Sequence, residues 1–244
     1  MTGGEPRVGT AGHEQPWAEL LTEDDRARLA KTRFGRRVGF GRIPALLLVD
    51  VQNYMVGPPN LGDDTGYPFA CGDTAREAVS RLAPLVAAAR SAAVPVFYAR
   101  HELRRDDRDL GVSRLRRDLL NLDGWCIEGT TGAEFVPSVA PLPDDRVVVK
   151  KKWSAFFGTP LLSALVDLGI DTVVVAGGAT SSSVRATVVD STSFNFRTLL
   201  VSDCVFDRFR VSHLTALFDM DRQYADVVPR DDVLTHFARL EASP

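Results

Sequence analysis

The sequence has few cysteines, no long apolar run and no excess of positive charge, and each shortage argues against a class of protein. Cys71, Cys126 and Cys204 are irregularly spaced and have no histidine cluster beside them, which disfavours a disulfide framework or a zinc site. No segment reaches about 18 consecutive apolar residues, as a membrane-spanning helix would need. The polar amino-terminal residues lack the apolar stretch of a signal peptide. We therefore expect a soluble, cytoplasmic protein with reduced thiols and no membrane contact.

The charges are nearly balanced, with 29 Lys and Arg against 32 Asp and Glu, a net charge of −3. Proteins that bind nucleic acid usually carry a basic excess, so we expect none here and favour a small neutral or anionic ligand. Apolar residues make up 45% of the 244 residues, enough for one sizeable core. We expect residues 33–244 to form one domain. Residues 1–32 would form an arm, mobile over 1–16, and a short helix that begins after Thr22.

Short apolar runs alternate with helical patterns along most of the chain. The runs are continuous and β-branched, which is typical of strands buried on both faces. Their alternation with helices predicts an α/β fold with three Rossmann-like layers, in which helices flank a parallel sheet through right-handed crossovers. An irregular piece as long as 101–131 is usually functional or an interaction arm. We expect strands at 45–51, 94–100, 146–150, 171–178 and 197–203, and helices at 22–31, 73–92, 158–169 and 182–193.

Residues that end the apolar runs are the first candidates for a site, because ligands of open parallel sheets bind beyond the carboxyl ends of the strands. Asp50 directly follows ALLLV, where an unpaired buried charge would be costly. It is either part of a site or the cap of a turn. Lys150 ends the run VVV on its core side. The alternative is a solvated basic cluster with Lys151 and Lys152.

The segment GGATSSS, residues 177–183, places two glycines before an expected helix start. Backbone N–H groups converge in such a turn, and the positive end of the helix dipole would point at Ser183. This arrangement would stabilise an anionic nucleophile and a developing oxyanion. Thr180, Ser181 and Ser182 are also good helix caps, so a plain N-cap is the alternative.

Five segments together resemble the isochorismatase-like cysteine hydrolases, and within them the branch of N-carbamoylsarcosine amidase and maleamate amidohydrolase. Each segment alone is a weak signal, but five in the same order over about residues 33–230 are specific. They are GFGRIPALLLVDVQN (39–53), VVVKKKWSAFFGT (147–159), GGATSSSVRAT (177–187), VSDCVFDR (201–208) and LFDMDRQYADVV (217–228).

The resemblance implies hydrolysis of a linear amide or N-carbamoyl C–N bond in a small molecule that carries a carboxylate. The family uses an Asp as general base and acid, a Lys as its electrostatic partner and a Cys as nucleophile. The matching positions are Asp50, Lys150 and Ser183, so this chain has serine where the family has cysteine. The resemblance also implies a cis peptide at Gly178–Ala179 and an oxyanion hole made by the amides of Ala179 and Ser183.

Further site residues follow from the same resemblance. Arg208 matches an arginine that binds the substrate carboxylate, with a surface ion pair to Asp207 as the alternative. The nicotinamidase branch has an Asp/His metal site, but the segment after the second strand offers only His101. We therefore expect no metal and no cofactor. Members of the family typically assemble as dimers or tetramers, so the resemblance also implies a homodimer or homotetramer. Four more side chains are expected to contact substrate: Thr180, Asn53, Trp153 and Phe156.

Serine at position 183 changes the expected reactivity. A thiol has a pKa near ~8.5, whereas a hydroxyl is closer to bulk water at about 15.7. The difference of roughly seven units corresponds to on the order of 10 kcal/mol of additional deprotonation cost. Three explanations stay open. In the first, Ser183 replaces a natural cysteine. In the second, the natural protein uses serine, or it skips the covalent step as isochorismatases do when they hydrolyse a vinyl ether. In the third, the protein is a catalytically silent homologue that binds ligand.

Overall fold

The computed structural model describes residues 15–32, 34–57, 67–115 and 125–242, and the arm expected over 1–16 lies almost entirely outside them. The predicted first helix is present as α1 (Glu23–Thr32). Thr22 caps it, because its hydroxyl oxygen accepts the Asp25 N–H at 3.2 Å. Trp17, ahead of this helix, is buried in the core.

Six parallel strands form one sheet in the order β3-β2-β1-β4-β5-β6. The five predicted strands are all present, with ends that differ by up to three residues. The central strands β1 and β4 are buried at every position, which explains their unbroken apolar sequences. The bounds are β1 (Pro44–Val49), β2 (Val96–His101), β3 (Arg146–Lys150), β4 (Thr172–Gly178), β5 (Arg197–Phe206) and β6 (Asp226–Val228).

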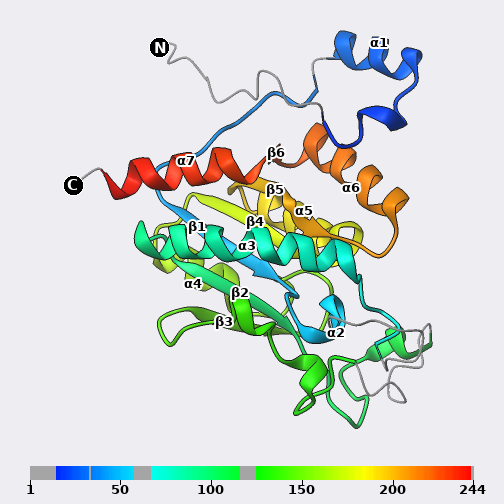
Figure 1. Cartoon of the computed structure of the whole chain (residues 1–244), viewed down its shortest axis with the longest axis vertical. Helices are drawn as coiled ribbons and strands as arrows, with labels where there is room; N and C mark the ends of the chain where they lie inside the picture. The colour runs from blue at the N-terminus through cyan, green and yellow to red at the C-terminus, as the bar shows by residue number, and fades with distance from the viewer. Residues whose placement is uncertain (1–14, 33, 58–66, 116–124, 243–244) are drawn as a thin grey trace.

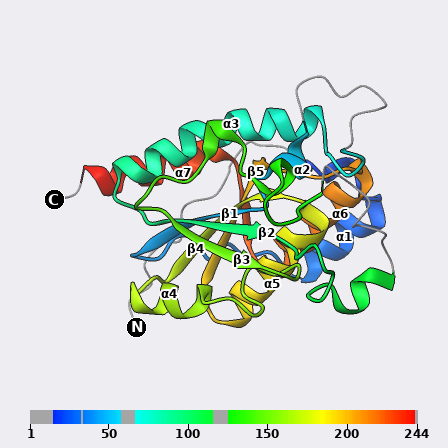
Figure 2. The same cartoon turned by 90° about the horizontal axis from the view of Figure 1, so that it is seen from below.

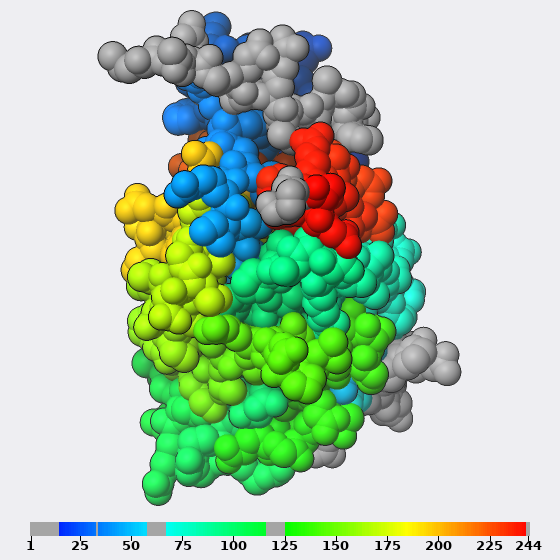
Figure 3. Space-filling model, turned by 90° about the vertical axis from the view of Figure 1, so that its left-hand side faces the viewer, coloured from blue at the N-terminus to red at the C-terminus, as the bar shows by residue number. Residues whose placement is uncertain are grey.

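Helices cover both faces of the sheet, as predicted, and Figures 1 and 2 show the three layers. Alternate residues of β1 divide between two cores: Leu46 and Leu48 pack in the core of the first face, and Leu47 in that of the second. Figure 3 shows α7 beside α3 on the first face. That face carries α3 (Asp73–Ser91) and α7 (Arg230–Glu241), and the second carries α4 (Leu161–Asp167), α5 (Arg185–Ser193) and α6 (Arg210–Gln223).

The strand β6 and the helices α2 (Asn53–Val56), α6 and α7 were not predicted. β6 has only three residues, too few for an alternation or a run to be recognised. α6 does not confine its apolar residues to one buried stripe, since Val211 is largely exposed while Leu217 is fully buried. α7 does carry a signal, because acidic residues occupy its first turn and Val233 and Phe237 are spaced by four.

The strand order reverses between β1 and β4, and the chain folds over the carboxyl ends of the strands near this point. The short helix α2 (Asn53–Val56) follows β1 there. Two isolated bridges, Gln52 with Phe135 and Leu103 with Ile127, tie the long connection after β2 to this edge. In the described part of the chain, no helix has both the length and the apolar character needed to cross a membrane.

Candidate active site

Asp50 lies directly after β1 in a left-handed backbone conformation, with a φ of 50°. Asp tolerates this region better than most residues, but it is uncommon outside turns and functional sites. The Asp50 N–H donates to the Ala99 carbonyl at 3.0 Å, which keeps the residue attached to the sheet. Its side chain is 1% exposed. The carboxylate is therefore held in the core at the edge where ligands bind in this type of sheet.

Lys150 ends β3 and is equally buried, so the prediction of a core-side lysine is confirmed. Its ammonium donates to Asp50 Oδ2 at 2.9 Å, Ser183 Oγ at 3.2 Å and the Lys152 carbonyl at 3.1 Å. An ammonium has three hydrogens, so these three acceptors satisfy it completely. Strands β1 and β3 and the turn after β4 thus bring three side chains together. We call Asp50, Lys150 and Ser183 the buried triad.

Two glycines let the chain after β4 pass close to its neighbours. A Cβ on Gly177 would lie 2.1 Å from the Val49 carbonyl oxygen, and one on Gly178 would lie 2.3 Å from the Phe206 ring. Gly177 also has a φ of 111°. The peptide bond between Gly178 and Ala179 is cis, at the position that the family resemblance implies. Only glycine fits at both positions, which explains the GG pair before the serines.

The turn that carries Ser183 is a single π-helical turn, Thr180–Val184, which leads into α5. Such turns often occur at functional sites. The residues that precede the two helical segments are Ala179 and Val184, and neither makes a side-chain capping hydrogen bond. The plain N-cap that the sequence allowed is therefore not what this serine-rich segment provides.

Burial raises the pKa of Asp50, and the Lys150 ammonium opposes that rise. The Ser183 hydroxyl lies close enough to favour the charged carboxylate as well. Oδ1 of Asp50 nevertheless has no hydrogen-bond partner that meets normal geometry. The carboxyl group therefore has a free lone pair beside the hydroxyl whose oxygen accepts from Lys150. This arrangement suits a proton acceptor next to a nucleophile.

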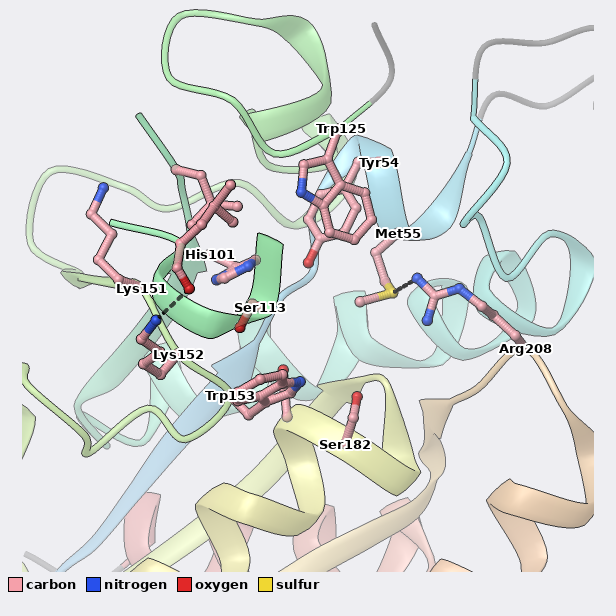
Figure 4. Close-up of a pocket in the computed structure, with 13 residues that line it drawn as sticks. Tyr54, Met55, His101, Ser113, Trp125, Lys151, Lys152, Trp153, Ser182 and Arg208 are labelled. Carbon is pink, nitrogen blue, oxygen red and sulfur yellow. Dashed lines mark hydrogen bonds between the residues drawn. The ribbon is translucent and has the colours of Figure 1, made fainter. Parts of the chain in front are cut away.

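Ser183 is one of the residues that line a cavity of about 60 Å³ (Figure 4). Ser182, Trp153 and Arg208 also line it, so two of the expected substrate contacts face the cavity. Asp50 and Lys150 do not line it, because both side chains are almost completely buried. The remaining lining comes from α2, the end of β2, the long connection and the segment after β3: Tyr54, Met55, His101, Leu103, Leu110, Ser113, Trp125, Lys151 and Lys152.

One side of the cavity is built from aromatic rings and an arginine, and we call Tyr54, Met55, Trp125 and Arg208 the aromatic wall. Trp125 meets the Tyr54 ring edge-on, with centroids 4.8 Å apart. The Arg208 guanidinium lies 3.2 Å from the Met55 sulfur and over the Phe69 ring. Its Nε is buried without a partner. Sequence analysis identified Arg208 but missed Tyr54 and Met55, although both directly follow the VDVQN segment.

The alternative for Arg208, an ion pair with Asp207, is not present. The Asp207 carboxylate instead accepts the backbone N–H groups of Ser181 and Arg208, each at 2.7 Å. Asp207 therefore fixes the turn that carries the serines. The guanidinium of Arg208 has no carboxylate partner among the described residues, so its positive charge is available to the cavity that it lines.

Three expected substrate contacts do not line the cavity, and each correction has a structural reason. The Thr180 hydroxyl is turned inward, where it donates to the Phe206 carbonyl at 3.1 Å and meets His213 Nδ1 at 2.9 Å. The Asn53 amide donates to the Thr131 carbonyl and borders a separate apolar hollow next to α3. Phe156 packs in the core on the second face of the sheet.

No described cysteine can substitute for the serine. Cys126 and Cys204 are fully buried, and burial raises the pKa of both thiols. Burial also raises the pKa of Cys71, to about 12. Within the described ranges, His, Cys, Asp and Glu side chains form no group of three or more that could hold a metal ion.

The isochorismatase domain family model matches residues 44–232. The chain belongs to the isochorismatase family. This membership agrees with the resemblance that the five sequence segments carry and with the observed parallel sheet.

The chain is also similar to individual members of this family. The chain is 37% identical over 208 residues to maleamate amidohydrolase of Pseudomonas putida, covering 85% of this chain and 92% of the relative. It is 29% identical over 214 residues to N-carbamoylsarcosine amidase of an Arthrobacter species, covering 85% and 76%. An isochorismatase family protein from Desulfovibrio vulgaris has a similar crystal structure, with a TM-score of 0.72, 31% identity and coverage of 82% and 100%.

Proposed function

We propose that the protein is an amidohydrolase that cleaves a linear amide or N-carbamoyl C–N bond in a small molecule carrying a carboxylate. One observation carries the proposal: the buried Lys150 ammonium contacts both the Asp50 carboxylate and the Ser183 hydroxyl, and Ser183 lines a small cavity. Both curated relatives are named for amide hydrolysis, of maleamate and of N-carbamoylsarcosine. The unpaired cation of Arg208 on the aromatic wall supports an anionic group on the substrate.

The mechanism follows from these positions. Asp50 takes the proton of the nucleophile at 183 through its free Oδ1, and the nucleophile attacks the amide carbonyl carbon. Lys150 stabilises the charge on both neighbours. We propose that the backbone N–H groups of Ala179 and Ser183 bind the oxyanion that forms on the carbonyl oxygen. Asp50 then returns its proton to the leaving nitrogen, and water releases the acyl group.

Ser183 makes this reaction slow in the present sequence. Its hydroxyl loses a proton at a cost on the order of 10 kcal/mol above that of a thiol, and a carboxylate is a weaker base than the histidine that usually activates serine. We propose that position 183 is the nucleophile's position and that cysteine there restores full reactivity.

Vinyl-ether hydrolysis without a covalent intermediate is the second candidate. The observation that favours it is the raised pKa of Asp50, since a protonated carboxyl group can donate its proton to a vinyl ether. That reaction does not need a nucleophile at 183. A protein that only binds its ligand is the third possibility.

The deciding experiment is Ser183→Cys, assayed for ammonia release from a panel of small amides and N-carbamoyl amino acids. We expect a gain of at least about 100-fold over the unchanged protein. Ser182→Cys is the matched control, because Ser182 lines the same cavity but does not contact Lys150. It should give no gain.

Other results would support the alternatives. Isochorismate cleavage at the same rate with serine or cysteine at 183 would support vinyl-ether hydrolysis. Tight binding without turnover in either form would support a binding protein.

We also propose a cytoplasmic homodimer or homotetramer. Several large apolar side chains are more than 60% exposed, among them Val112, Phe157 and Phe209. Apolar side chains in contact with solvent often mark an interface. Light scattering on the purified protein measures the assembly, and a monomer at micromolar concentration would contradict it.

A further inference from the structure

Tyr54 carries a polar group that the reaction described above does not use. The residue is 1% exposed and lines the same cavity as Ser183. Its ring is fixed by the edge-on contact with Trp125 and by α2, which begins four residues after the end of β1. In Figure 4 the hydroxyl points toward the middle of the cavity. The orientation of this hydroxyl is therefore set by the core and not by a ligand.

The hydroxyl of Tyr54 makes no hydrogen bond to any residue that the structure describes. Tyr54 lines the cavity, so a hydroxyl without a protein partner there can donate its hydrogen bond to a bound ligand, which phenylalanine could not do. Two other donors of the aromatic wall also lack partners, since the Trp125 indole N–H and the Arg208 Nε are buried without a hydrogen bond. Groups of this kind on one side of a cavity indicate a ligand that supplies the missing partners.

The surroundings of the Tyr54 hydroxyl decide the chemistry of that ligand. Burial raises the pKa of Tyr54 well above its ordinary value, and the negative charge of Asp50 adds to the rise, so the phenol keeps its proton. The positive charge of Arg208 also acts on the same hydroxyl. A neutral O–H donor and a guanidinium on one wall match a group with two acceptor atoms and a negative charge. A carboxylate has both properties.

We propose that the Tyr54 hydroxyl is a specificity-determining donor that binds one carboxylate oxygen of the substrate while Arg208 binds the carboxylate alongside it. The inference rests on the proposed amidohydrolase function and narrows its substrates to half-amides, with a carboxylate at one end and the scissile amide at the other. A second carboxamide in place of the carboxylate would keep one acceptor oxygen, but it would lose the negative charge and turn an NH2 donor toward one of the two donors. The wall therefore discriminates against diamides.

Binding to the protein with Ser183 unchanged tests the inference apart from turnover. The probes are maleamate and its neutral diamide, maleamide, titrated calorimetrically. We expect the unchanged protein to bind maleamate at least about tenfold more tightly than maleamide. Tyr54→Phe should weaken maleamate binding about tenfold and change maleamide binding less than twofold. Tyr98→Phe is the matched control, since Tyr98 is equally buried but does not line the cavity. It should change neither affinity.

Two results would overturn the inference: an unchanged protein without preference for maleamate, or Tyr54→Phe with the preference intact. If Tyr54→Phe is not recovered folded, Tyr54→Met gives the same comparison. The ammonia-release assay of Ser183→Cys reports separately on the proposed function. Turnover there with no effect of Tyr54→Phe on binding would reject only the role of Tyr54. Selective binding without turnover would reject the hydrolase and leave the role of Tyr54 in place.

Discussion

The hydrogen-bond donors on the two sides of the cavity differ in how far they are satisfied. In the buried triad the Lys150 ammonium has three acceptors within 3.2 Å. On the aromatic wall, the Tyr54 hydroxyl, the Trp125 N–H and the Arg208 Nε have none. The triad contacts therefore stabilise the fold itself, whereas the donors of the aromatic wall are available to bind a ligand. Substitutions in the triad should cost stability and activity together, and substitutions in the wall should cost binding alone.

The largest effect is expected for Lys150→Met. Methionine has similar length without charge, so the Asp50 carboxylate loses its ion pair while it stays buried. Breaking a buried pair in this way costs about 3–5 kcal/mol of folding free energy. Denaturant unfolding measures the loss, and Ser183→Cys provides the background in which activity should fall by at least about 1,000-fold.

A Lys150→Met protein that is as stable as the unchanged one would contradict the description of the triad. It would mean that Asp50 becomes protonated on substitution without cost, and that the ion pair is not a structural requirement. Lys151→Met is the control, because Lys151 is partly exposed and pairs with Asp109 outside the triad. We expect at most about 1 kcal/mol for it.

Arg208→Met is expected to affect binding by about 10- to 100-fold and to leave stability unchanged. A hydrogen bond to a charged group contributes about 1.5–3 kcal/mol to binding, whereas Arg208 is only partly buried and, within the described residues, has no carboxylate partner whose loss would lower the free energy of unfolding. KM for a carboxylate-bearing amide in the Ser183→Cys background and a thermal melt measure the two effects. Arg208→Lys keeps the charge but loses the bidentate geometry, so its KM should lie between the KM values of the protein with Arg208 unchanged and of Arg208→Met.

A large loss of stability in Arg208→Met would remove the distinction between the two sides of the cavity. It would show that the contacts with Met55 and Phe69 hold the wall together, so that Arg208 belongs to the fold.

The sequence predicted the triad better than the wall, and the reason is physical. Asp50 and Lys150 each end a continuous apolar run, and the turn with Ser183 ends a third. A parallel sheet brings such ends to one edge whatever the details of packing. The wall has no comparable rule, because Tyr54, Trp125 and Arg208 come from three separate connections and meet through side-chain packing.

The same reasoning explains why three of the expected substrate contacts do not line the cavity. Thr180, Asn53 and Phe156 lie next to triad segments in the sequence, but neighbours along a strand end or a helical turn point in different directions. Among the five predicted strands only the ends shifted. The unpredicted elements β6 and α6 are ones whose burial is decided by tertiary contacts, as the exposed Val211 and buried Leu217 in one helix illustrate.

A smaller effect is expected at Thr180, whose hydroxyl, like the Lys150 ammonium, has its hydrogen-bond partners within the protein. Thr180→Val keeps the shape but leaves the Phe206 carbonyl and His213 Nδ1 without their partner. We expect a loss of about 1–3 kcal/mol in unfolding free energy, and KM within about threefold. Thr180→Ser retains the hydroxyl and should restore most of the stability. A tenfold rise in KM in a stable Thr180→Val protein would return Thr180 to the list of substrate contacts.

The smallest effect is expected from pH, through the raised pKa of Asp50. The base must be unprotonated, so kcat/KM of Ser183→Cys should fall on the acid side with an apparent pKa above 3.8, the ordinary value for an aspartate. The folded protein binds this proton more tightly than the unfolded chain does. The carboxyl group therefore contributes stability that is present below pH 3.8 and is lost as the pH rises through the folded pKa.

Maleamide suits this pH profile although the aromatic wall should bind it weakly, because it has no carboxylate of its own whose titration would add to the acid limb. An acid limb at or below pH 3.8 would mean that the Lys150 ammonium outweighs desolvation at Asp50. The triad would then hold a permanently ionised carboxylate, and proton donation to a vinyl ether would lose its support. An acid limb well above that value would sharpen the contrast between the two sides of the cavity. The triad would then satisfy its cation completely while keeping its carboxylate ready to exchange a proton.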